Sequence, residues 1–239
     1  MKKAIFITVR TNSSRLPQKA LIKIDKVATI EHLIERVKHS KKKDGIILCT
    51  TQEPADDVLV EIAANHGIES FRGSTEDKLE RWNGAAKKFG IEFFITADGD
   101  DLFCEPELID LAFDQYEINK PDFIAGDGKG IIVGSFTYGI KASALERVCK
   151  IKDTSDTEMM WVYFTDTDLF KCEDLDLEKV PDIYKRPEIR MTLDYPDDLR
   201  FFETIIHYFN KTQSSEYYNL RDIVSYLDQN PEVIKMNQY

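Results

Sequence analysis

The chain has 239 residues, and its 43 Asp and Glu exceed its 32 Lys and Arg, so the formal net charge at pH 7 is −11. Hydrophobic residues make up 42% of the sequence and charged residues 31%, the balance of an ordinary globular protein. The acidic excess argues against a nucleic-acid-binding protein. No apolar run reaches 18 residues, so the sequence predicts no membrane-spanning helix.

The N-terminal apolar stretch and the cysteines bear on localisation. Residues 4–9 are too short for the core of a signal peptide, and Arg10 follows them directly. The four cysteines are widely spaced and form no CxxC pair, which favours reduced thiols over disulfides or a zinc site. We therefore expect a cytoplasmic protein.

Apolar, β-branched runs alternate with segments of helical periodicity in the first half of the chain. The runs predict strands over residues 4–9, 46–50, 69–71, 93–97 and 123–125. The periodic segments predict helices over residues 29–41, 54–66, 76–89 and 106–116. Because the strands are apolar on both faces, the pattern predicts an α/β fold with a mainly parallel sheet and helices on both faces. The loops at the carboxyl ends of the strands should then converge on one ligand-binding cleft.

The alternation loosens after about residue 126. The sequence predicts an extended segment over residues 131–139, a helix over 142–150, a strand over 189–193 and helices over 196–210 and 217–227. It shows no internal repeat and no low-complexity linker. We therefore expect a single domain over residues 1–239, with residues 126–186 as an insertion on the substrate side of the cleft.

The N-terminal segment is cationic, since residues 1–24 contain six Lys and Arg and no acidic residue. Three of these cations, Arg10, Arg15 and Lys19, lie with Ser13 in the loop after the first predicted strand. Backbone amides, hydroxyls and cations at the ligand-binding end of a sheet suit a phosphate chain. The loop matches neither the P-loop nor the dinucleotide pattern. Its position and charge favour phosphate binding over a structural turn.

Three carboxylates, Asp98, Asp100 and Asp101, follow the predicted strand over residues 93–97. Mg²⁺ would offset their repulsion, because it binds one or two carboxylates together with phosphate oxygens. The alternative is an acidic turn that caps the next helix. Asp194 follows a second predicted strand and precedes a helix, which places it to face the same cleft.

A further candidate is the segment from Phe71 to Ser74, at the end of the third predicted strand. Gly73 lets the backbone approach a flat ligand such as a base. Ser74 by itself is more typical of a helix N-cap. No histidine shows metal-ligand spacing, and no GxSxG nucleophile motif occurs.

The order of these segments resembles a known family. RTNSSRLPQKAL is similar to the RxxSxRLPGKxL signature of cytidylyltransferases, which include spore-coat polysaccharide F-type proteins and the 3-deoxy-manno-octulosonate and N-acylneuraminate enzymes. TTQEPADDVLVEIA, FRGSTEDKLERW, FITADGDDLFCEPELID and RMTLDYPDDL resemble further blocks of the spore-coat type, in the same order. The resemblance covers residues 3–115 and returns near 186–210. It implies a Rossmann-like nucleotidyltransferase fold and CTP as the nucleotide.

The sequence departs from the family pattern at three places. Gln18 stands where the signature usually has Gly, and the family's Asp-x-Pro-Leu is lengthened here to Asp98-Gly99-Asp100-Asp101-Leu102. The segments GSFTYGIK and DTEMMWVYFTDTDLF do not match the sugar-acid enzymes. The acceptor is therefore not identified by the resemblance.

The resemblance implies a triphosphate site in the loop after the first strand. The residues that would bind the triphosphate are Arg10, Ser13, Arg15 and Lys19. The three cations would also act in catalysis by neutralising the charge that grows on the leaving pyrophosphate. Asp98 would act with them as the first ligand of Mg²⁺.

The resemblance also implies the remaining ligands. Asp194 would be the second Mg²⁺ ligand. The residues expected near the cytosine and ribose are Thr50, Arg72, Gly73 and Ser74.

Candidates for acceptor binding come from position alone. Arg186 and Arg190 lie close to Asp194 in the sequence, and Glu158 lies in the expected insertion. The two arginines would hold an anionic acceptor, and Glu158 would project from the insertion into the site.

Together these features predict a Mg²⁺-dependent enzyme that transfers CMP from CTP to a sugar, sugar acid or related acceptor and releases pyrophosphate. Such an enzyme would serve surface polysaccharide or glycoconjugate biosynthesis, and a homodimer fits the resemblance. One alternative is a metal-dependent glycosyltransferase of GT-A type, which would use Asp98-Gly99-Asp100 as a DxD motif. Another is a non-catalytic nucleotide-binding protein.

Overall fold

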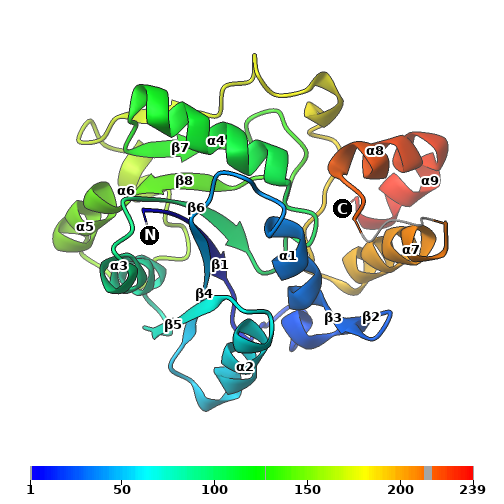
Figure 1. The fold of residues 1–239 in the computed structure, drawn as a ribbon, viewed down its shortest axis with the longest axis horizontal. Helices are drawn as coiled ribbons and strands as arrows, with labels where there is room; N and C mark the ends of the chain where they lie inside the picture. The colour runs from blue at the N-terminus through cyan, green and yellow to red at the C-terminus, as the bar shows by residue number, and fades with distance from the viewer. Residues whose placement is uncertain (1, 127, 213–216, 239) are drawn as a thin grey trace.

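The computed structural model describes residues 2–126, 128–212 and 217–238. These residues contain a seven-stranded sheet in the order β5-β4-β1-β6-β8-β7-β9 (Figure 1). Its strands are β1 (Lys3–Thr8), β4 (Gly45–Thr51), β5 (Glu69–Gly73), β6 (Phe93–Asp98), β7 (Phe123–Ala125), β8 (Tyr138–Lys141) and β9 (Cys172–Asp174). Only β8 runs antiparallel to its neighbours within this sheet. The predicted mainly parallel sheet is confirmed.

Helices cover both faces of the sheet, as predicted (Figure 1). Alternate residues of β1 enter different cores: Ala4 and Phe6 face one, and Ile5 and Ile7 face the other. The first core packs against α3 (Lys78–Phe89), α5 (Ala142–Ile151) and α6 (Val162–Thr165). The second packs against α1 (Thr29–Val37), α2 (Asp57–Asn65), α4 (Pro106–Asn119), α7 (Pro196–Thr212) and α8 (Leu220–Gln229).

Short elements complete the chain. A two-stranded antiparallel ribbon joins β2 (Lys23–Ile24) to β3 (Val27–Ala28), and α9 (Pro231–Ile234) follows α8. The 3₁₀ turns are η1 (Lys19–Leu21), η2 (Pro54–Asp56), η3 (Asp182–Tyr184) and η4 (Lys235–Asn237). None of the helices in the described ranges has the length and apolar character needed to cross a bilayer.

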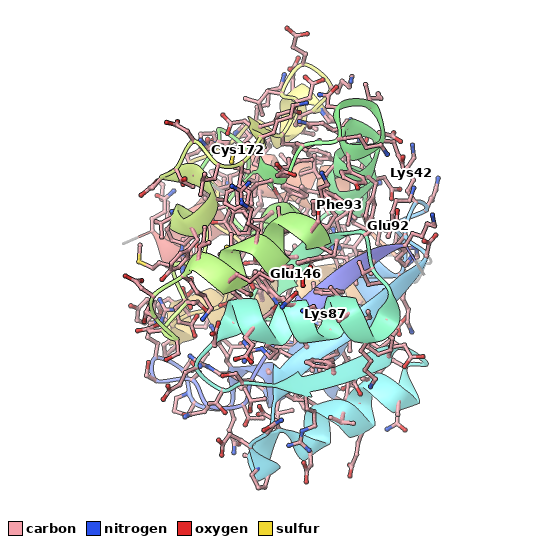
Figure 2. The ribbon with its side chains drawn as sticks, turned by 90° about the vertical axis from the view of Figure 1, so that its left-hand side faces the viewer. Lys42, Lys87, Glu92, Phe93, Glu146 and Cys172 are labelled. Atoms are coloured by element: carbon pink, nitrogen blue, oxygen red, sulfur yellow. The ribbon has the colours of Figure 1, made fainter. Side chains whose placement is uncertain are left out.

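On the face that carries α3 and α5, the two helices lie side by side (Figure 2). Lys87 of α3 pairs with Glu146 of α5 at 3.2 Å across this contact. The sequence ends α3 at Gly90, which adopts a φ of 65°, a conformation that costs glycine little. The opposite end of α3 begins next to the carboxyl ends of the strands, which brings its first turn to the expected cleft.

Two segments of the second half differ from the prediction. Residues 189–193 form no strand in the described structure, apart from a single parallel bridge between Val133 and Arg190. Their amides donate instead to loops, from Met191 to Val133 and from Leu193 to Asp100. The expected extended segment 131–139 turns at Gly134, with a φ of 82°, so its strand starts only at Tyr138.

The segment 126–186, expected as an insertion, supplies two strands of the sheet. β8 inserts between β6 and β7, and β9 pairs in parallel with β7 at the edge. The part of this segment that reaches the cleft is the stretch before α6, which carries Glu158.

Candidate active site

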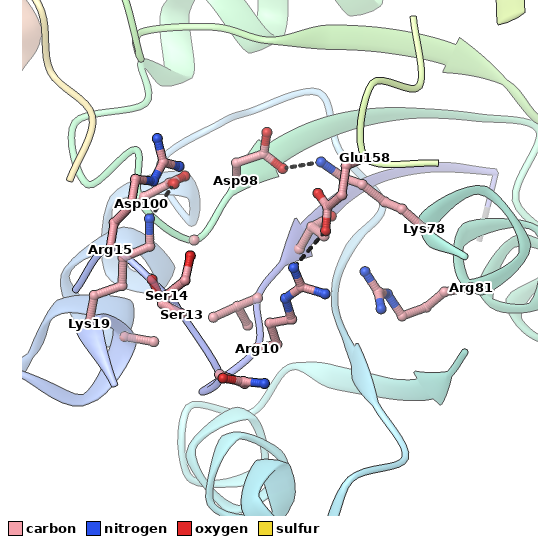
Figure 3. A pocket seen from close by; sticks show the side chains of 15 residues that line it. Arg10, Ser13, Ser14, Arg15, Lys19, Lys78, Arg81, Asp98, Asp100 and Glu158 are labelled. Carbon is pink, nitrogen blue, oxygen red and sulfur yellow. Dashed lines mark hydrogen bonds and ion pairs between the residues drawn. The ribbon is translucent and has the colours of Figure 1, made fainter. Parts of the chain in front are cut away.

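A cleft of about 260 Å³ opens at the carboxyl ends of β1 and β6 (Figure 3). Its lining comes from residues 8–20, from the first turn of α3, from residues 98–100 and from Glu158. The prediction that the loops after the strands converge on one cleft therefore holds for β1 and β6. Six of the predicted site residues line it, namely Arg10, Ser13, Arg15, Lys19, Asp98 and Glu158.

Lys19 ties the cationic loop to two distant carboxylates. Its Nζ lies 2.7 Å from Oδ2 of Asp100 and 3.0 Å from Oδ1 of Asp194, and it donates to the Leu193 carbonyl at 2.8 Å. Burial alone would lower the pKa of Lys19, but the charges of Asp100 and Asp194 outweigh it and raise that pKa. Lys19 is therefore a protonated cation at neutral pH.

Asp194 is surrounded by cations. Its Oδ1 also lies 2.8 Å from Nη2 of Arg15, and its Oδ2 lies 3.0 Å from Nη2 of Arg190. Asp198, which is fully buried, pairs with Arg190 and accepts from the backbone amides of Asp194 and Tyr195 at 2.8 Å. The first turn of α7 thus holds both Asp194 and its arginine in place.

Asp98 is the last residue of β6, and Asp100 follows it in the next loop. Thr8 pairs with Asp98 in the β1–β6 register, and the amide of Gly99 donates to the Thr8 carbonyl. A Cβ at Gly99 would lie 2.8 Å from the Val9 side chain, so this close crossing requires glycine. Burial raises the pKa of Asp100, and the neighbouring carboxylates Asp98 and Asp194 act in the same direction against Lys19. The carboxylates of Asp98, Asp100 and Asp194 thus lie within electrostatic reach of one another around Asp100.

The opposite wall of the cleft comes from β1 and α3 (Figure 3). Nη2 of Arg10 pairs with Oε1 of Glu158 at 2.7 Å, and Nη1 donates to the Thr75 carbonyl at 3.3 Å. Lys78 pairs through Nζ with Oδ1 of Asp98 at 3.1 Å. Arg81, one turn further along α3, also lines the cleft.

Glu158 reaches the cleft because the chain before it is anchored to the start of α3. Asp77 caps α3 by accepting from the amide of Glu80 at 3.0 Å, and it also pairs with Lys152. The fully buried Thr157 donates to Asp77 at 3.0 Å and accepts from the amide of Leu79 at 3.1 Å. These bonds fix residues 152–157 against the helix.

The start of the cationic loop is held by the buried carboxylate of Asp56. Asp56 accepts from the amide and the hydroxyl of Thr11 at 2.8 and 2.7 Å, and from the hydroxyls of Thr50 at 2.9 Å and Thr51 at 2.5 Å. Burial alone would raise the pKa of Asp56, but these hydrogen bonds outweigh it and lower that pKa. A second cavity, lined by Thr51, Asp56 and Thr75, adjoins the cleft and shares Arg10 with it.

Comparison with known proteins identifies the family of the chain. The sequence model of a family described as "Cytidylyltransferase" matches residues 4–223. The chain belongs to the cytidylyltransferase family. The resemblance inferred from the RLPQK loop and the later blocks is thus confirmed, and the protein is an enzyme of this family.

Individual relatives are similar to this chain along nearly its whole length. An uncharacterized protein of Methanocaldococcus jannaschii is 32% identical, with 99% of this chain and 95% of the relative covered. The spore coat polysaccharide biosynthesis protein SpsF of Bacillus subtilis is 26% identical over 95% of this chain and 94% of its own. A solved cytidylyltransferase structure from Leptospira borgpetersenii superposes with a TM-score of 0.87 at 26% identity, covering 100% of this chain and 98% of its own. The Rossmann-like nucleotidyltransferase fold is confirmed.

A more distant structure shares the fold alone. CMP:2-keto-3-deoxy-manno-octonic acid synthetase superposes with a TM-score of 0.65 at 13% identity, covering 87% of this chain and 99% of that one. The fold therefore extends to chains whose sequences are only distantly similar.

In this cytidylyltransferase the residues expected near cytosine and ribose take supporting positions. Thr50 is fully buried and donates to Asp56. Arg72 donates to the carbonyls of Thr51 and Glu53. Ser74 accepts from the amide of Asp77 at 3.0 Å and so closes the turn before α3, while Asp77 and not Ser74 is the N-cap of that helix. The second cavity is lined by neighbours of these residues, and the predicted contacts with a nucleoside stay predictions.

The three residues predicted to bind the acceptor lie in different parts of the structure. Glu158 lies in the cleft, and Arg190 lies behind Asp194. Arg186 pairs with Glu188 and Asp228 on the surface, and it is not among the residues that line the cleft. Its predicted role in acceptor binding gains no support from the geometry.

The donors for a metal ion are few. Among the described residues no group of three or more His, Cys, Asp or Glu is arranged to hold a metal. Asp98 shares one oxygen with Lys78, and Asp194 uses both oxygens for cations. One or two carboxylates completed by phosphate and water oxygens is a usual set for Mg²⁺ at nucleotide sites. The residues present therefore fit Mg²⁺ when a nucleotide brings its phosphates.

Three polar residues that shape the site received no predicted role in binding or catalysis. Lys78 and Arg81 lie within a predicted amphipathic helix, where cations usually face solvent. Asp56 lies in a predicted helix start, where an acidic residue is ordinary. The signal that pointed to all three is their place in the blocks FRGSTEDKLERW and TTQEPADDVLVEIA, which resemble the family.

Proposed function

We propose that the protein transfers CMP from CTP to a sugar-like acceptor in a Mg²⁺-dependent reaction that releases pyrophosphate. The observation that carries this proposal is the bridge made by Lys19, which joins the signature loop to Asp100 and Asp194. It brings together the cations that suit a triphosphate and the carboxylates that suit Mg²⁺, although they lie up to 175 residues apart in the sequence.

The reaction is a displacement at the α-phosphorus. An acceptor oxygen forms a bond to this atom, the bond from the α-phosphorus to the bridging oxygen of the β-phosphate breaks, and pyrophosphate leaves with the electron pair. Arg15 and Lys19 would hold the β- and γ-phosphates and neutralise the charge that grows on them. Asp98 and Asp194 would hold Mg²⁺, which would polarise the α-phosphate when bound.

The acceptor is proposed as an anionic sugar. The chain resembles SpsF, whose name places it in spore coat polysaccharide biosynthesis, and 47% of it resembles a 3-deoxy-manno-octulosonate cytidylyltransferase of Chloroherpeton thalassium at 28% identity. The product would enter the synthesis of a surface polysaccharide.

The DxD alternative is disfavoured by the family match, which covers residues 4–223. Lys78 pairs with Asp98, and Lys19 pairs with Asp100, so separate lysines engage the two carboxylates of Asp98-Gly99-Asp100.

The proposal is tested by incubating the protein with CTP, Mg²⁺ and a panel of acidic sugars, and by following pyrophosphate and CMP conjugates by mass spectrometry. We expect stoichiometric pyrophosphate and CMP-sugar with at least one acceptor. Asp98→Asn should abolish product while leaving the circular dichroism spectrum unchanged. Release of free UDP or CMP from a nucleotide sugar, without pyrophosphate, would instead establish the glycosyltransferase.

A further inference from the structure

Arg81 is a buried cation that the protein does not neutralise. Its side chain belongs to a residue only 4% exposed, and its Nε has no hydrogen-bond partner. One terminal nitrogen donates to the Ser74 carbonyl at 2.6 Å. No carboxylate of the described residues forms an ion pair with it, although it lines the cleft. A buried guanidinium without a counter-ion is costly, so this position is suited to an anion that arrives with a ligand.

The carboxylates near Arg81 interact with other residues. Glu158 pairs with Arg10 at 2.7 Å, and the Asp56 carboxylate accepts from three threonines. Burial lowers the pKa of Arg81, and the positive charge of Arg10 adds to this effect, although Glu158 and Asp56 oppose it. Among the described residues, the guanidinium thus has charged neighbours but no ion-pair partner.

A second buried arginine shows how the same chain treats a structural guanidinium. Arg36 is 6% exposed, and its Nε also lacks a partner. It pairs with Glu105 at 3.4 Å and lies over the rings of Phe103, Tyr217 and Tyr218. Arg36 is far from the cleft lining and is compensated from within, whereas Arg81 lines the cleft and is not.

The position of Arg81 indicates which anion it meets. Arg10 lines both the cleft and the adjoining cavity formed by Thr51, Asp56 and Thr75, and Arg81 lies beside Arg10 at this junction (Figure 3). A nucleoside in the adjoining cavity would place its 5′-phosphate at the junction. The β- and γ-phosphates would then extend toward Arg15 and Lys19.

We propose that Arg81 binds the α-phosphoryl group of the nucleotide, the group that the enzyme transfers. This assignment rests on the proposed function and adds to it a phosphate-binding residue outside the signature loop. Arg81 and Arg10 hold the part of CTP that stays with the acceptor, and Arg15 and Lys19 hold the part that leaves.

The test compares CMP with cytidine, which differ only by the α-phosphate. Binding of each is measured by isothermal titration calorimetry in EDTA, so that only protein side chains contribute. We expect the protein to bind CMP roughly 10- to 100-fold more tightly than cytidine, the advantage that a charge-assisted contact gives. Arg81→Gln should remove most of this preference and leave the affinity for cytidine unchanged, and Arg81→Lys should retain part of it.

Arg36→Gln is the matched control, because it removes an equally buried guanidinium away from the cleft. It should lower the melting temperature and leave the CMP preference intact. An Arg81→Gln variant that keeps the full preference, or that loses CMP and cytidine affinity equally, overturns the assignment. If Arg81→Gln does not fold, an unchanged preference in Arg81→Lys overturns it. A protein that binds neither ligand contradicts the proposed function as well, whereas an unchanged variant contradicts this assignment alone.

Discussion

The two walls of the cleft differ in how far the protein neutralises its own cations. The loop-end cluster contains Arg15, Lys19 and Arg190, and it faces the carboxylates Asp100, Asp194 and Asp198. The helix-side cluster contains Arg10, Lys78 and Arg81, and within the described residues its ion pairs are with Glu158 and Asp98 alone. The first cluster has as many carboxylates as cations, whereas the second has one cation more.

This difference separates what the protein builds in advance from what a ligand must complete. Lys19 reaches two carboxylates and a carbonyl at 2.7 to 3.0 Å, so the loop-end cluster is positioned before CTP arrives. Pre-positioned charges stabilise a transition state without reorganisation. The helix-side cluster leaves Arg81 without a counter-ion, so it gains most when an anion binds.

The largest effect should come from breaking the loop-end cluster. Lys19→Ala removes the cation that contacts Asp100 and Asp194 and would face the leaving pyrophosphate. We expect turnover to fall by about 10²- to 10³-fold, the loss typical of one pre-positioned electrostatic group. Pyrophosphate release under saturating CTP measures it. Lys23→Ala, an exposed lysine four residues later, is the control and should keep full turnover; near-normal release from Lys19→Ala would remove the assigned role.

The next largest effect should come from weakening the hydrogen bonds that Asp56 accepts at the start of the cationic loop. Asp56→Asn weakens the acceptor that fixes Thr11, Thr50 and Thr51, so we expect the free energy of unfolding at pH 7 to fall by about 2–3 kcal/mol. Because folding lowers the pKa of Asp56, its contribution is present above about pH 4 and is lost as the pH falls through its folded pKa. Urea denaturation between pH 3 and 7 measures both.

The neighbouring Asp57→Asn is the control for this substitution, since the Asp57 side chain is 60% exposed and pairs only with Arg72. It should change the unfolding free energy by less than about 1 kcal/mol. A difference between wild type and Asp56→Asn that stays constant down to pH 3 would show that the charge of Asp56 is not the source of its effect.

A smaller effect should come from removing one carboxylate of the helix-side cluster. Glu158→Gln removes the carboxylate that pairs with Arg10, so we expect CTP to bind roughly 2- to 5-fold more tightly, the value of a partly exposed ion pair. Calorimetry with CTP measures it, and Glu146→Gln on α5 serves as the control (Figure 2). Unchanged CTP affinity with a raised KM for the acceptor would show that Glu158 binds the acceptor rather than competing with the nucleotide.

The smallest effect concerns the turn before Lys19. Gln18 adopts a φ of 54°, which is the left-handed region, at the position where the family signature usually has Gly. Gln18→Gly should therefore keep the turn and the turnover, whereas the β-branched Gln18→Val should be less stable than Gln18→Gly by about 1–2 kcal/mol. Thermal denaturation of the pair measures this difference. Equal stabilities would show that the left-handed turn is not needed.

The sequence predicts the first half of this molecule well because local patterns there coincide with tertiary structure. The strands β1, β4 and β6 contain continuous apolar runs, and the next α-helices along the chain, α1, α2 and α4, pack against the same face of the sheet. Residues 189–193 look equally strand-like. In the structure their amides pair with loop carbonyls at Val133 and Asp100, partners about 60 and 90 residues away that no local pattern reveals.

The site residues also divide into those that local sequence patterns reveal and those that only the tertiary structure reveals. Arg10, Arg15, Lys19 and Asp98 were found because they cluster in loops directly after strands. No role was predicted for Arg81, because a cation within an amphipathic helix gives no sign of being buried until the packing is known. Arg186 was selected because it lies near Asp194 in the sequence, and its side chain turns to Glu188 and Asp228 instead.

A crystal structure of the protein with CTP and Mg²⁺ would locate the three phosphorus atoms of the nucleotide relative to the two clusters. We expect the α-phosphorus beside Arg10 and Arg81, the β- and γ-phosphorus atoms beside Arg15 and Lys19, and Mg²⁺ on Asp98 and Asp194. A nucleotide bound in the reverse direction, or outside the cleft between the two clusters, would contradict this arrangement.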